Sequence, residues 1–382
     1  MREALAWARH GLGRTSPNPV VGAVVVRDGR VVGHGFHRRA GEPHAEVVAL
    51  AQAGPGARGA TLYVTLEPCA HTGRTGPCTE EILQAGVARV VVATRDPDPH
   101  VDGRGIERLR AAGIDVVEGV LGRDSLQMNE AYVTHRRTGL PFVTLKWAMS
   151  LDGKISARRD APTTITGETA RAYAHELRNT HDAVLVGINT VLADDPQLTC
   201  RIPGGRDPIR VVLDSRLRTP LAARVLHVES LAPTLIVTSE AVSADRVAIF
   251  QATGAEVLTL PGRRPSVRQL MGVLAGRDVL SVLVEGGGTV HAAALAEGVA
   301  CKVIAVISPG LIGGAKAPTA VEGPEPLAVT GLVRLTDVSV RRLGDDVLIE
   351  GYLPQIPYMQ PEAVAGEVDA QAVGSADVHG DR

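Results

Sequence analysis

The chain has 382 residues, of which 45% are hydrophobic and 21% charged, and this composition excludes a chain that is disordered throughout. Forty basic and 42 acidic side chains give a net charge of -2, and aromatic residues make up only 3%. Neither a strong positive field nor a base-stacking surface is therefore available for nucleic acid. No apolar run approaches the ~20 residues that a membrane-spanning helix needs. The length fits about two or three domains, and we expect their partners to be small molecules.

The first part of the chain alternates helices with strands, which predicts an α/β domain. Apolar residues at helical spacing predict a helix over residues 1–12. The apolar run 20–26, followed by the turn Asp28-Gly29, predicts a strand that enters a hairpin. Further helices are expected over 43–53, 77–85, 106–112 and 124–137, and further strands over 61–66, 89–94 and 114–118.

The sequence Gly139-Leu140-Pro141 breaks this pattern, and we place a domain boundary there, with domains over residues 1–138 and 139–355. The second part repeats the α/β alternation. Its strands are expected over 142–149, 183–187, 209–213, 234–238, 256–260, 279–285, 302–307, 339–343 and 347–352. Residues 356–382 are mostly small and acidic and cannot bury enough surface to offset their ordering entropy, so we expect a disordered tail.

The four cysteines do not form a disulfide scaffold, and the N-terminus lacks the apolar segment of a secretory signal, which together favour a reducing, cytoplasmic setting. Cys200 and Cys301 are interpreted as packing thiols. Cys69 and Cys78 stand close together, which in such a setting indicates a metal site.

His44 lies at a predicted helix start, and one histidine with two cysteines is the usual ligand set of a catalytic zinc ion with an open fourth position. Zinc lowers the pKa of water in that position to about 7. Glu46 lies two residues from His44, where a carboxylate can take the proton of this water and pass it to a leaving amine. The alternatives are a structural zinc site, for which His71 would compete as the fourth ligand, and separately packed cysteine and histidine residues.

These residues resemble the zinc nucleoside and nucleobase deaminases, whose signature is H-x-E followed by P-C-x-x-C, with the glutamate as a proton shuttle and not a ligand. Here eight residues separate the two cysteines. That insert, with Ser16-Pro-Asn-Pro19 and the stretch 41–46, is similar to the deaminase half of the bifunctional riboflavin biosynthesis deaminase/reductase family. The resemblance implies that zinc is bound by His44, Cys69 and Cys78. It also implies that Glu46 is the catalytic residue that transfers protons. It implies substrate contacts at Asn18, His37, His71 and Arg74, although either histidine, taken alone, also fits a surface or packing role.

Five motifs follow in the second part of the chain. They lie at Val143–Lys154, Leu177-Arg178, Thr190–Thr199, Val212–Ser215 and Val284–Val290. The last motif is a predicted strand, three glycines and a helix, and backbone N–H groups exposed at such a helix start suit a phosphate. The three glycines alone also fit a packing turn.

In this order the motifs resemble the reductase half of the same family, which has a dihydrofolate-reductase-like fold and uses NADPH. The resemblance implies NADPH contacts at Ala148, Thr164, Thr190, Asp194, Ser215, Gly287, Gly288, Thr289, Val290, His291, Ala292 and Ala293. It implies substrate contacts at Pro162, Arg178, Leu198, Arg201 and Glu285. The two arginines suit a sugar phosphate, although each alone also fits an ion pair. Pro162 and Thr164 depart from the hydroxyl and aromatic residues that are frequent in the family.

The resemblance covers residues 1–353 and implies a cytidine-deaminase-like α/β/α domain followed by a dihydrofolate-reductase-like α/β domain. The expected reactions are zinc-dependent hydrolytic deamination of 2,5-diamino-6-(5-phosphoribosylamino)pyrimidin-4(3H)-one and NADPH-dependent reduction of the ribosyl chain, giving 5-amino-6-(5-phosphoribitylamino)uracil. We expect a homo-oligomer without nucleic-acid or membrane partners. Two alternatives remain: a polynucleotide deaminase, against which the charge and the few aromatic residues argue, and a nucleotide-binding protein whose reductase half has lost activity, which the departures at Pro162 and Thr164 keep open.

Overall fold

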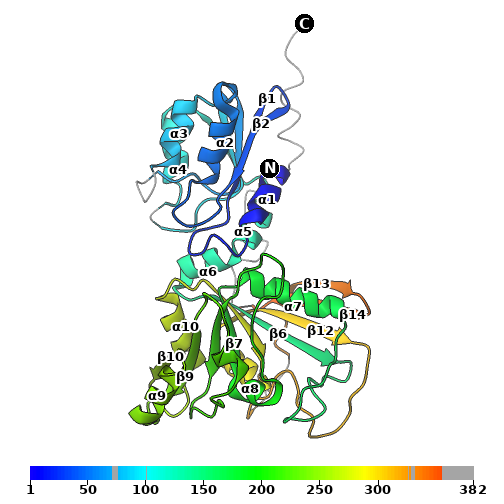
Figure 1. Cartoon of the computed structure of the whole chain (residues 1–382). Helices are drawn as coiled ribbons and strands as arrows, with labels where there is room; N and C mark the ends of the chain where they lie inside the picture. Colours follow the sequence, from blue (N-terminus) through cyan, green and yellow to red (C-terminus); the bar gives the residue numbers. More distant parts are fainter. Residues whose placement is uncertain (71–75, 100, 326, 328–331, 355–382) are drawn as a thin grey trace. The chain divides into compact units, whose positions relative to one another are not determined.

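The computed structural model of the chain describes residues 1–70, 76–99, 101–325, 327 and 332–354 (Figure 1). The expected tail, 356–382, therefore lies outside the described residues. Contacts between residues divide the chain into two units, one that ends at Gly139 and one that begins at Leu140. Both units are α/β, which confirms the predicted fold class.

A five-stranded sheet forms the centre of the first unit, in the order β2-β1-β3-β4-β5. Its strands are β1 (Gly22–Arg27), β2 (Arg30–Phe36), β3 (Thr61–Val64), β4 (Arg89–Val92) and β5 (Asp115–Glu118). Strands β1 and β2 form the predicted antiparallel hairpin, β3 pairs antiparallel with β1, and β3, β4 and β5 run parallel. The helices are α1 (Arg2–Ala8), α2 (Ala45–Ala53), α3 (Cys78–Ala85), α4 (Arg104–Ala111), α5 (Gly122–Met128) and α6 (Glu130–Thr138).

Helices cover both faces of this sheet. Side chains from α2, α3 and α4 share one buried cluster with Ala23 and Val25 of β1. Gly22, which alternates with these residues and so faces the opposite side, lies against α1, where a Cβ on it would come within 2.1 Å of the Ala4 carbonyl oxygen. The missing side chain lets the helix backbone approach the strand, and the first unit is an α/β/α layer structure.

The expected helix over 124–137 is instead two helices, α5 and α6, with a break at Asn129. The side-chain amide of Asn129 is buried, accepts from the Val20 N–H at 2.7 Å and donates to the Val20 carbonyl at 2.9 Å. The prediction of one continuous helix was wrong. The Asn129 side chain forms its hydrogen bonds with the backbone of Val20, 109 residues earlier in the chain, which the local sequence pattern does not reveal. The break thereby fixes the segment that follows Asn18.

The second unit has a nine-stranded sheet in the order β10-β9-β8-β7-β11-β6-β12-β14-β13. Its strands are β6 (Phe142–Ser150), β7 (Ala183–Gly187), β8 (Ile209–Leu213), β9 (Thr234–Ser239), β10 (Glu256–Leu260), β11 (Ser281–Gly286), β12 (Ala300–Ser308), β13 (Thr336–Leu343) and β14 (Asp346–Tyr352). The first seven strands of this order run parallel, whereas β14 and β13 pair antiparallel at one edge. Its helices are α7 (Glu168–Thr180), α8 (Ile188–Asp194), α9 (Ala244–Gln251), α10 (Val267–Ala275) and α11 (Gly288–Ala296).

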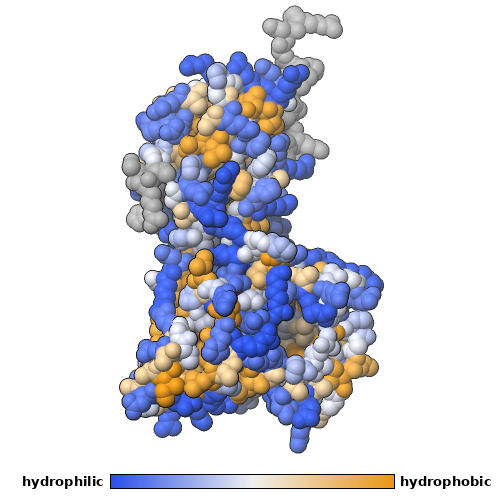
Figure 2. Space-filling model, in the orientation of Figure 1, coloured by the Kyte–Doolittle hydropathy of each residue, from blue (hydrophilic) through white to orange (hydrophobic). Residues whose placement is uncertain are grey.

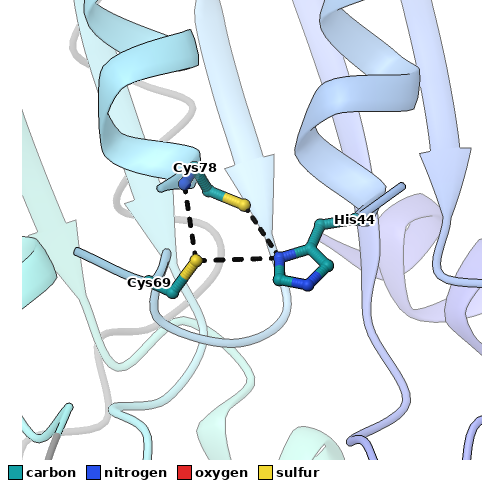
Figure 3. Close-up of side chains that lie close together, drawn as sticks. All are labelled: His44, Cys69 and Cys78. Carbon is teal, nitrogen blue, oxygen red and sulfur yellow. Dashed lines mark hydrogen bonds between the residues drawn. The ribbon is translucent and has the colours of Figure 1, made fainter. Parts of the chain in front are cut away.

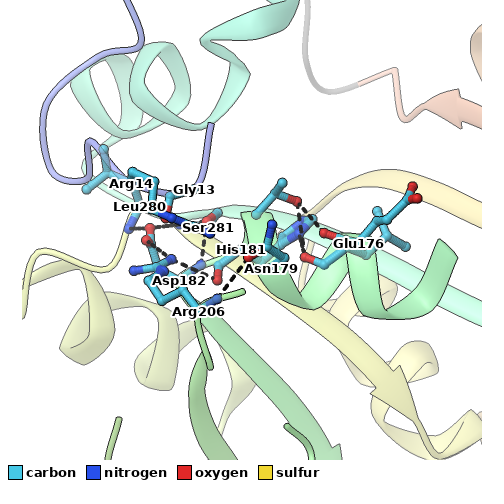
Figure 4. A network of polar contacts seen from close by, with 11 residues as sticks. Gly13, Arg14, Glu176, Asn179, His181, Asp182, Arg206, Leu280 and Ser281 are labelled. Atoms are coloured by element: carbon cyan, nitrogen blue, oxygen red, sulfur yellow. Dashed lines mark hydrogen bonds and ion pairs between the residues drawn. The ribbon is translucent and has the colours of Figure 1, made fainter. Parts of the chain in front are cut away.

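The amino ends of β7 and β11 are joined by a buried carboxylate (Figure 4). Asp182 accepts from the N–H groups of Leu280 and Ser281, at 3.0 and 3.1 Å, and from the Ser281 hydroxyl at 3.1 Å. Arg206 pairs with the same carboxylate at 3.1 Å, while its backbone N–H donates to the Asn179 side chain at 2.9 Å. Because β11 comes about a hundred residues after β7, this network fixes a long-range strand pairing.

Hydrophilic side chains predominate on the face of the molecule that Figure 2 shows, with hydrophobic ones between them. Among the described residues, no helix combines the length and the apolar character that crossing a membrane requires.

Candidate functional site

Three potential metal ligands of the first unit lie together at the starts of two helices and in one loop (Figure 3). His44 immediately precedes α2, Cys78 is the first residue of α3, and Cys69 lies in the loop after β3. The Nδ1 atom of His44 is 3.0 Å from Cys78 Sγ and 3.7 Å from Cys69 Sγ. All three candidate ligand atoms lie within 4.8 Å of one another.

The 3.7 Å distance between His44 and Cys69 matches a zinc site, and the 3.0 Å distance between His44 and Cys78 would lengthen when the ion binds. With Zn–S bonds of about 2.3 Å and Zn–N bonds of about 2.1 Å, a tetrahedral site separates its ligand atoms by roughly 3.6–3.8 Å. In the part of the chain that the structure describes, the cluster holds these three side chains and no further histidine, cysteine or acid. Three protein ligands leave a coordination position for water, as in catalytic zinc sites.

Hydrogen bonding in the cluster favours a thiolate at Cys69, whereas the hydrogen bond with Cys69 and burial raise the pKa of Cys78. Hydrogen bonds from Cys78 and contact with His44 lower the pKa of the Cys69 thiol to about 4, although burial opposes this shift. The Cys78 backbone N–H, at the start of α3, donates to Cys69 Sγ at 3.4 Å. The thiolate, which is the metal-binding form of cysteine, is therefore available at neutral pH.

Glu46 lies in the first turn of α2 and is only 3% exposed. Burial raises the pKa of its carboxyl group to about 7, against the opposing effect of the His44 charge. The carboxyl group also hydrogen-bonds with the Cys78 thiol, so it lies beside the three ligands. The structure thus brings together all four residues predicted for the zinc chemistry.

Two of the four expected substrate contacts also lie at this cluster. The Asn18 side-chain nitrogen is 3.0 Å from His37 Nε2, and the His37 and His44 rings meet edge to face with centroids 5.4 Å apart. His37 is buried, and this burial lowers its pKa, which favours the neutral ring. The other two, His71 and Arg74, lie outside the described residues.

Glu67 is a residue of this site to which the sequence analysis gave no role. Its buried carboxylate accepts from four backbone N–H groups: Gly103 and Gly105 at 2.9 Å, and Asp96 and Ile106 at 3.2 Å. Three of these residues lie at the start of α4, where N–H groups have no partner within the helix. Glu67 therefore anchors the loop that carries Cys69, and its position two residues before a ligand was the signal that could have indicated this.

In the second unit, a charged cluster lies where β11 ends. Arg178 of α7 forms a two-pronged ion pair with Glu285, at 2.8 and 2.6 Å, and donates to the Thr199 carbonyl at 3.1 Å. Their side chains are only 15% and 6% exposed. Burial alone would raise the pKa of Glu285, but the charge and hydrogen bonds of Arg178, with the charge of Lys146, lower it to about 2. Because its donors face Glu285 and Thr199, Arg178 is an ion-pair partner in this structure.

The glycine-rich turn after β11 meets the turn after β7. A Cβ on Gly286 would lie 2.6 Å from Thr190 Oγ1, and one on Gly288 would lie 2.5 Å from the Thr319 carbonyl oxygen. Gly287 has φ +87°, which only glycine adopts readily. The turn leads into the N–H groups of Gly288 and Thr289, which precede the first N–H of α11 that bonds back, that of Val290 to the Gly287 carbonyl at 2.8 Å. N–H groups at such a helix start suit a phosphate. These residues fit the pyrophosphate of a dinucleotide.

The other expected contacts of the second unit are placed as follows. Ala148 lies on β6 beside β12, Asp194 ends α8, and Ser215 follows β8. Leu198 is buried at φ +57°, whereas Arg201 is exposed, with its guanidinium 3.5 Å from the Gln197 side-chain oxygen. Thr289, Val290, His291, Ala292 and Ala293 form the first turns of α11.

His291 is held by contacts within the protein, whereas two other expected contacts are exposed to solvent. The buried His291 ring contacts the carbonyl oxygens of Ala320 and Val284, at 2.8 and 3.3 Å, so it holds α11 against the sheet. Pro162 and Thr164 are exposed in the segment before α7.

Comparison with known proteins assigns both units. Residues 1–94 match the family model of the cytidine and deoxycytidylate deaminase zinc-binding region, and residues 141–349 match that of the RibD C-terminal domain. The chain is thus a bifunctional enzyme that combines a zinc-dependent deaminase with an NADPH-dependent reductase.

Similar proteins cover nearly the whole chain. A riboflavin biosynthesis protein RibD of Aquifex aeolicus is 44% identical, over 82% of this chain and 87% of its own length. A solved structure of Acinetobacter baumannii RibD is 36% identical, covers 93% of this chain and 98% of its own, and superposes with a TM-score of 0.83. The diaminohydroxyphosphoribosylaminopyrimidine deaminase/5-amino-6-(5-phosphoribosylamino)uracil reductase of Thermotoga maritima is 38% identical, covers 92% and 97%, and has a TM-score of 0.80. The chain belongs to the RibD family of riboflavin biosynthesis enzymes.

Proposed function

We propose that the first unit hydrolytically removes the 2-amino group of 2,5-diamino-6-(5-phosphoribosylamino)pyrimidin-4(3H)-one, and that the second reduces the ribosyl chain of the product to give 5-amino-6-(5-phosphoribitylamino)uracil. The observation that carries the proposal is the cluster of His44, Cys69 and Cys78 with the buried Glu46 beside it. Family membership supplies the substrate class.

In the deaminase, His44, Cys69 and Cys78 would hold zinc. When bound, zinc supplies Lewis-acid activation of water. Glu46 takes a proton from the attacking water and returns it to the amino group, so that ammonia leaves and a carbonyl replaces it on the ring. Because the Glu46 side chain is buried, bulk water does not compete for this proton.

Asn18 and His37 are proposed to orient the pyrimidine ring. Their mutual contact at 3.0 Å and the edge-to-face packing of His37 on His44 support this role. His71 and Arg74 remain proposed substrate contacts on the strength of the motif alone.

In the reductase, the proposed NADPH contacts extend from the turn after β11, through Thr190 and Asp194 on α8, to Ser215, with Ala148 and Thr164 on the nicotinamide side. NADPH supplies the hydride. The turn at Gly286–Gly288 supports the pyrophosphate contact, and His291 supports it indirectly by holding α11.

The proposed substrate contacts of the reductase are Pro162, Arg178, Leu198, Arg201 and Glu285. Arg201 is exposed and is the better donor for the sugar phosphate, since Arg178 is engaged by Glu285. Arg178 would then orient the Glu285 carboxylate, which would also accept a hydrogen bond from the substrate.

We also propose a cytoplasmic homo-oligomer. The structure describes all four cysteines and joins none of them in a disulfide, which suits a reducing compartment where Cys69 and Cys78 would bind metal. Val338 and Val340 are exposed on β13, the edge strand of the second sheet, and offer apolar surface that an assembly would cover. Sedimentation velocity tests the oligomeric state, and a monomer at all concentrations would contradict it.

The deaminase assignment is tested with Glu46→Gln. We expect one zinc per chain to be retained, while ammonia release falls by about a hundredfold or more, the usual contribution of a general acid–base. NADPH oxidation with the deaminated intermediate should not change, and Glu81→Gln, an exposed glutamate of α3, is the matched control. Undiminished ammonia release in Glu46→Gln would refute the role of the carboxylate.

A further inference from the structure

The loop after β8 carries two exposed arginines, Arg216 and Arg218, to which the roles above assign nothing. We propose that Arg216 binds the 2′-phosphate of NADPH and so makes the reductase prefer NADPH to NADH. This inference rests on the proposed nucleotide site of the second unit, and it adds the side chain that binds the 2′-phosphate.

The position of the loop in the sheet suits this role. Strand β8 lies beside β7, and the register pairs Leu213, the last residue of β8, with Gly187, the last residue of β7. The first turn of α8, which directly follows β7, contributes Thr190, and Ser215 follows two residues after β8. Nucleotides bind across the carboxyl ends of neighbouring parallel strands. The loop after β8 lies two strands along the sheet from the pyrophosphate turn after β11, with β7 between them, and the adenosine end belongs on this side.

The loop is held rigidly. The fully buried carboxylate of Asp214 accepts from the Thr219 N–H at 2.7 Å and from its hydroxyl at 2.8 Å. Leu217 is fully buried in the core at φ +49°. Because Leu217 points into the core, its neighbours Arg216 and Arg218 are exposed, and little conformational entropy of the backbone is lost when they bind an anion.

Among the arginines of this region, Arg216 differs in having its guanidinium available. Arg218 donates to the Asn189 side-chain oxygen at 3.2 Å, and Arg224 is held by Asp195. Arg246 donates to the Leu217 carbonyl. The Arg216 guanidinium makes no hydrogen bond or ion pair with any residue that the structure describes.

The chemistry of the guanidinium matches the ligand. Its planar fork donates two parallel hydrogen bonds to a phosphate, whereas the ribose 2′-hydroxyl of NADH offers no charge to pair with. An arginine near the adenosine ribose is the general means by which dinucleotide sites accommodate the 2′-phosphate.

The test compares the binding of 2′,5′-ADP and 5′-AMP by calorimetry, since these two probes differ in the 2′-phosphate. We expect Arg216→Ala to weaken the binding of 2′,5′-ADP about tenfold to a hundredfold, the range of a charged hydrogen bond, and to leave 5′-AMP unchanged. Arg216→Lys should retain part of the preference. The kcat/KM ratio of NADPH to NADH should fall by the same factor. Arg263→Ala, an exposed arginine that follows β10 two strands away, is the matched control and should change neither probe.

Each outcome is decisive. If Arg216→Ala weakens both probes equally, or neither, Arg216 does not read the 2′-phosphate and the inference is wrong, while the proposed nucleotide site stands. If the unaltered enzyme binds neither probe, the nucleotide site itself is misplaced and both proposals fall. Circular dichroism verifies that the variant is folded, and ammonia release, an activity of the first unit, should not change.

Discussion

Replacing Glu67 by glutamine tests whether the loop that carries Cys69 depends on buried hydrogen bonds. One carboxylate oxygen accepts from Gly105 and Ile106, and the other from Asp96 and Gly103. In the amide, one of these oxygens becomes an NH₂ group, so two backbone N–H groups lose their acceptor and face a donor.

Two bonds to a charged acceptor, at about 1.5–3 kcal/mol each, set an upper range of about 3–6 kcal/mol for the loss. Relaxation recovers part of this, and we expect the first unit to lose about 3 kcal/mol of its unfolding free energy, a large share of the usual total for a domain. Displacement of Cys69 should also weaken zinc binding about 10- to 100-fold, the usual effect of removing a group that positions a metal ligand.

Urea unfolding measures the stability, followed by the fluorescence of Trp7. This tryptophan stacks on His34 with ring centroids 3.9 Å apart and therefore reports on the first unit. A Trp147→Phe background removes the second of the two tryptophans, which belongs to the other unit. Zinc affinity is measured by competition with a chromogenic chelator, and Glu81→Gln is the control. If Glu67→Gln matches the control in both measurements, the four hydrogen bonds do not support the site.

Three further predictions concern the two sites. In Gly105→Ala the new Cβ would lie 1.9 Å from the Pro68 carbonyl oxygen, so the loop that carries Cys69 must move and this variant should lose zinc. The control Gly56→Ala, whose Cβ would have no atom closer than 3.7 Å, should keep its zinc. Equal zinc content in the two variants would contradict the argument. Removing zinc with a chelator should abolish ammonia release and leave NADPH oxidation intact, and a parallel loss of both activities would show that the units are coupled. The pKa of Glu285 is lowered from 4.5 to about 2, so its ion pair with Arg178 stabilises the fold above about pH 4.5 and this stability is lost as the pH falls toward 2. Glu285→Gln should remove about 3 kcal/mol of that acid-dependent stability, seen as a flatter plot of unfolding free energy against pH, and an unchanged plot would exclude this ion pair as the cause.

The three residues that the structure brings together as a candidate metal site could be predicted from the sequence because each has a local signal. His44 and Cys78 both follow a proline at a helix start, and Cys69 follows one in a loop, so a short pattern contains ligand type and local geometry together. The strand spans 183–187, 209–213 and 256–260 were confirmed because each is short and rich in β-branched or other apolar residues.

What the sequence did not reveal depends on contacts between distant segments. The partners of Glu67 lie 29 to 39 residues further along the chain, and those of Asn129 lie 109 residues earlier. The engagement of Arg178 by Glu285 crosses 107 residues, so an arginine that suited a phosphate by residue type proved to be an ion-pair partner. Residue type and spacing indicate a ligand set, but they do not tell which charged groups are already neutralised by one another.

The carboxylate of Asp182 lies at the amino ends of β7 and β11, whereas Thr190, Ser215 and the glycine turn lie at the carboxyl ends of the same group of strands. The amino ends of these strands carry contacts that secure the fold, and the carboxyl ends carry the residues that we propose to bind the cofactor. We therefore expect the stability of the fold and the preference for a cofactor to change independently when residues are substituted at one end of the strands or the other. If Arg216 has the proposed role, substitution of this exposed side chain alone is expected to change the nucleotide preference while the melting temperature stays the same, whereas substitution of its buried neighbours Asp214 and Leu217 would also cost stability.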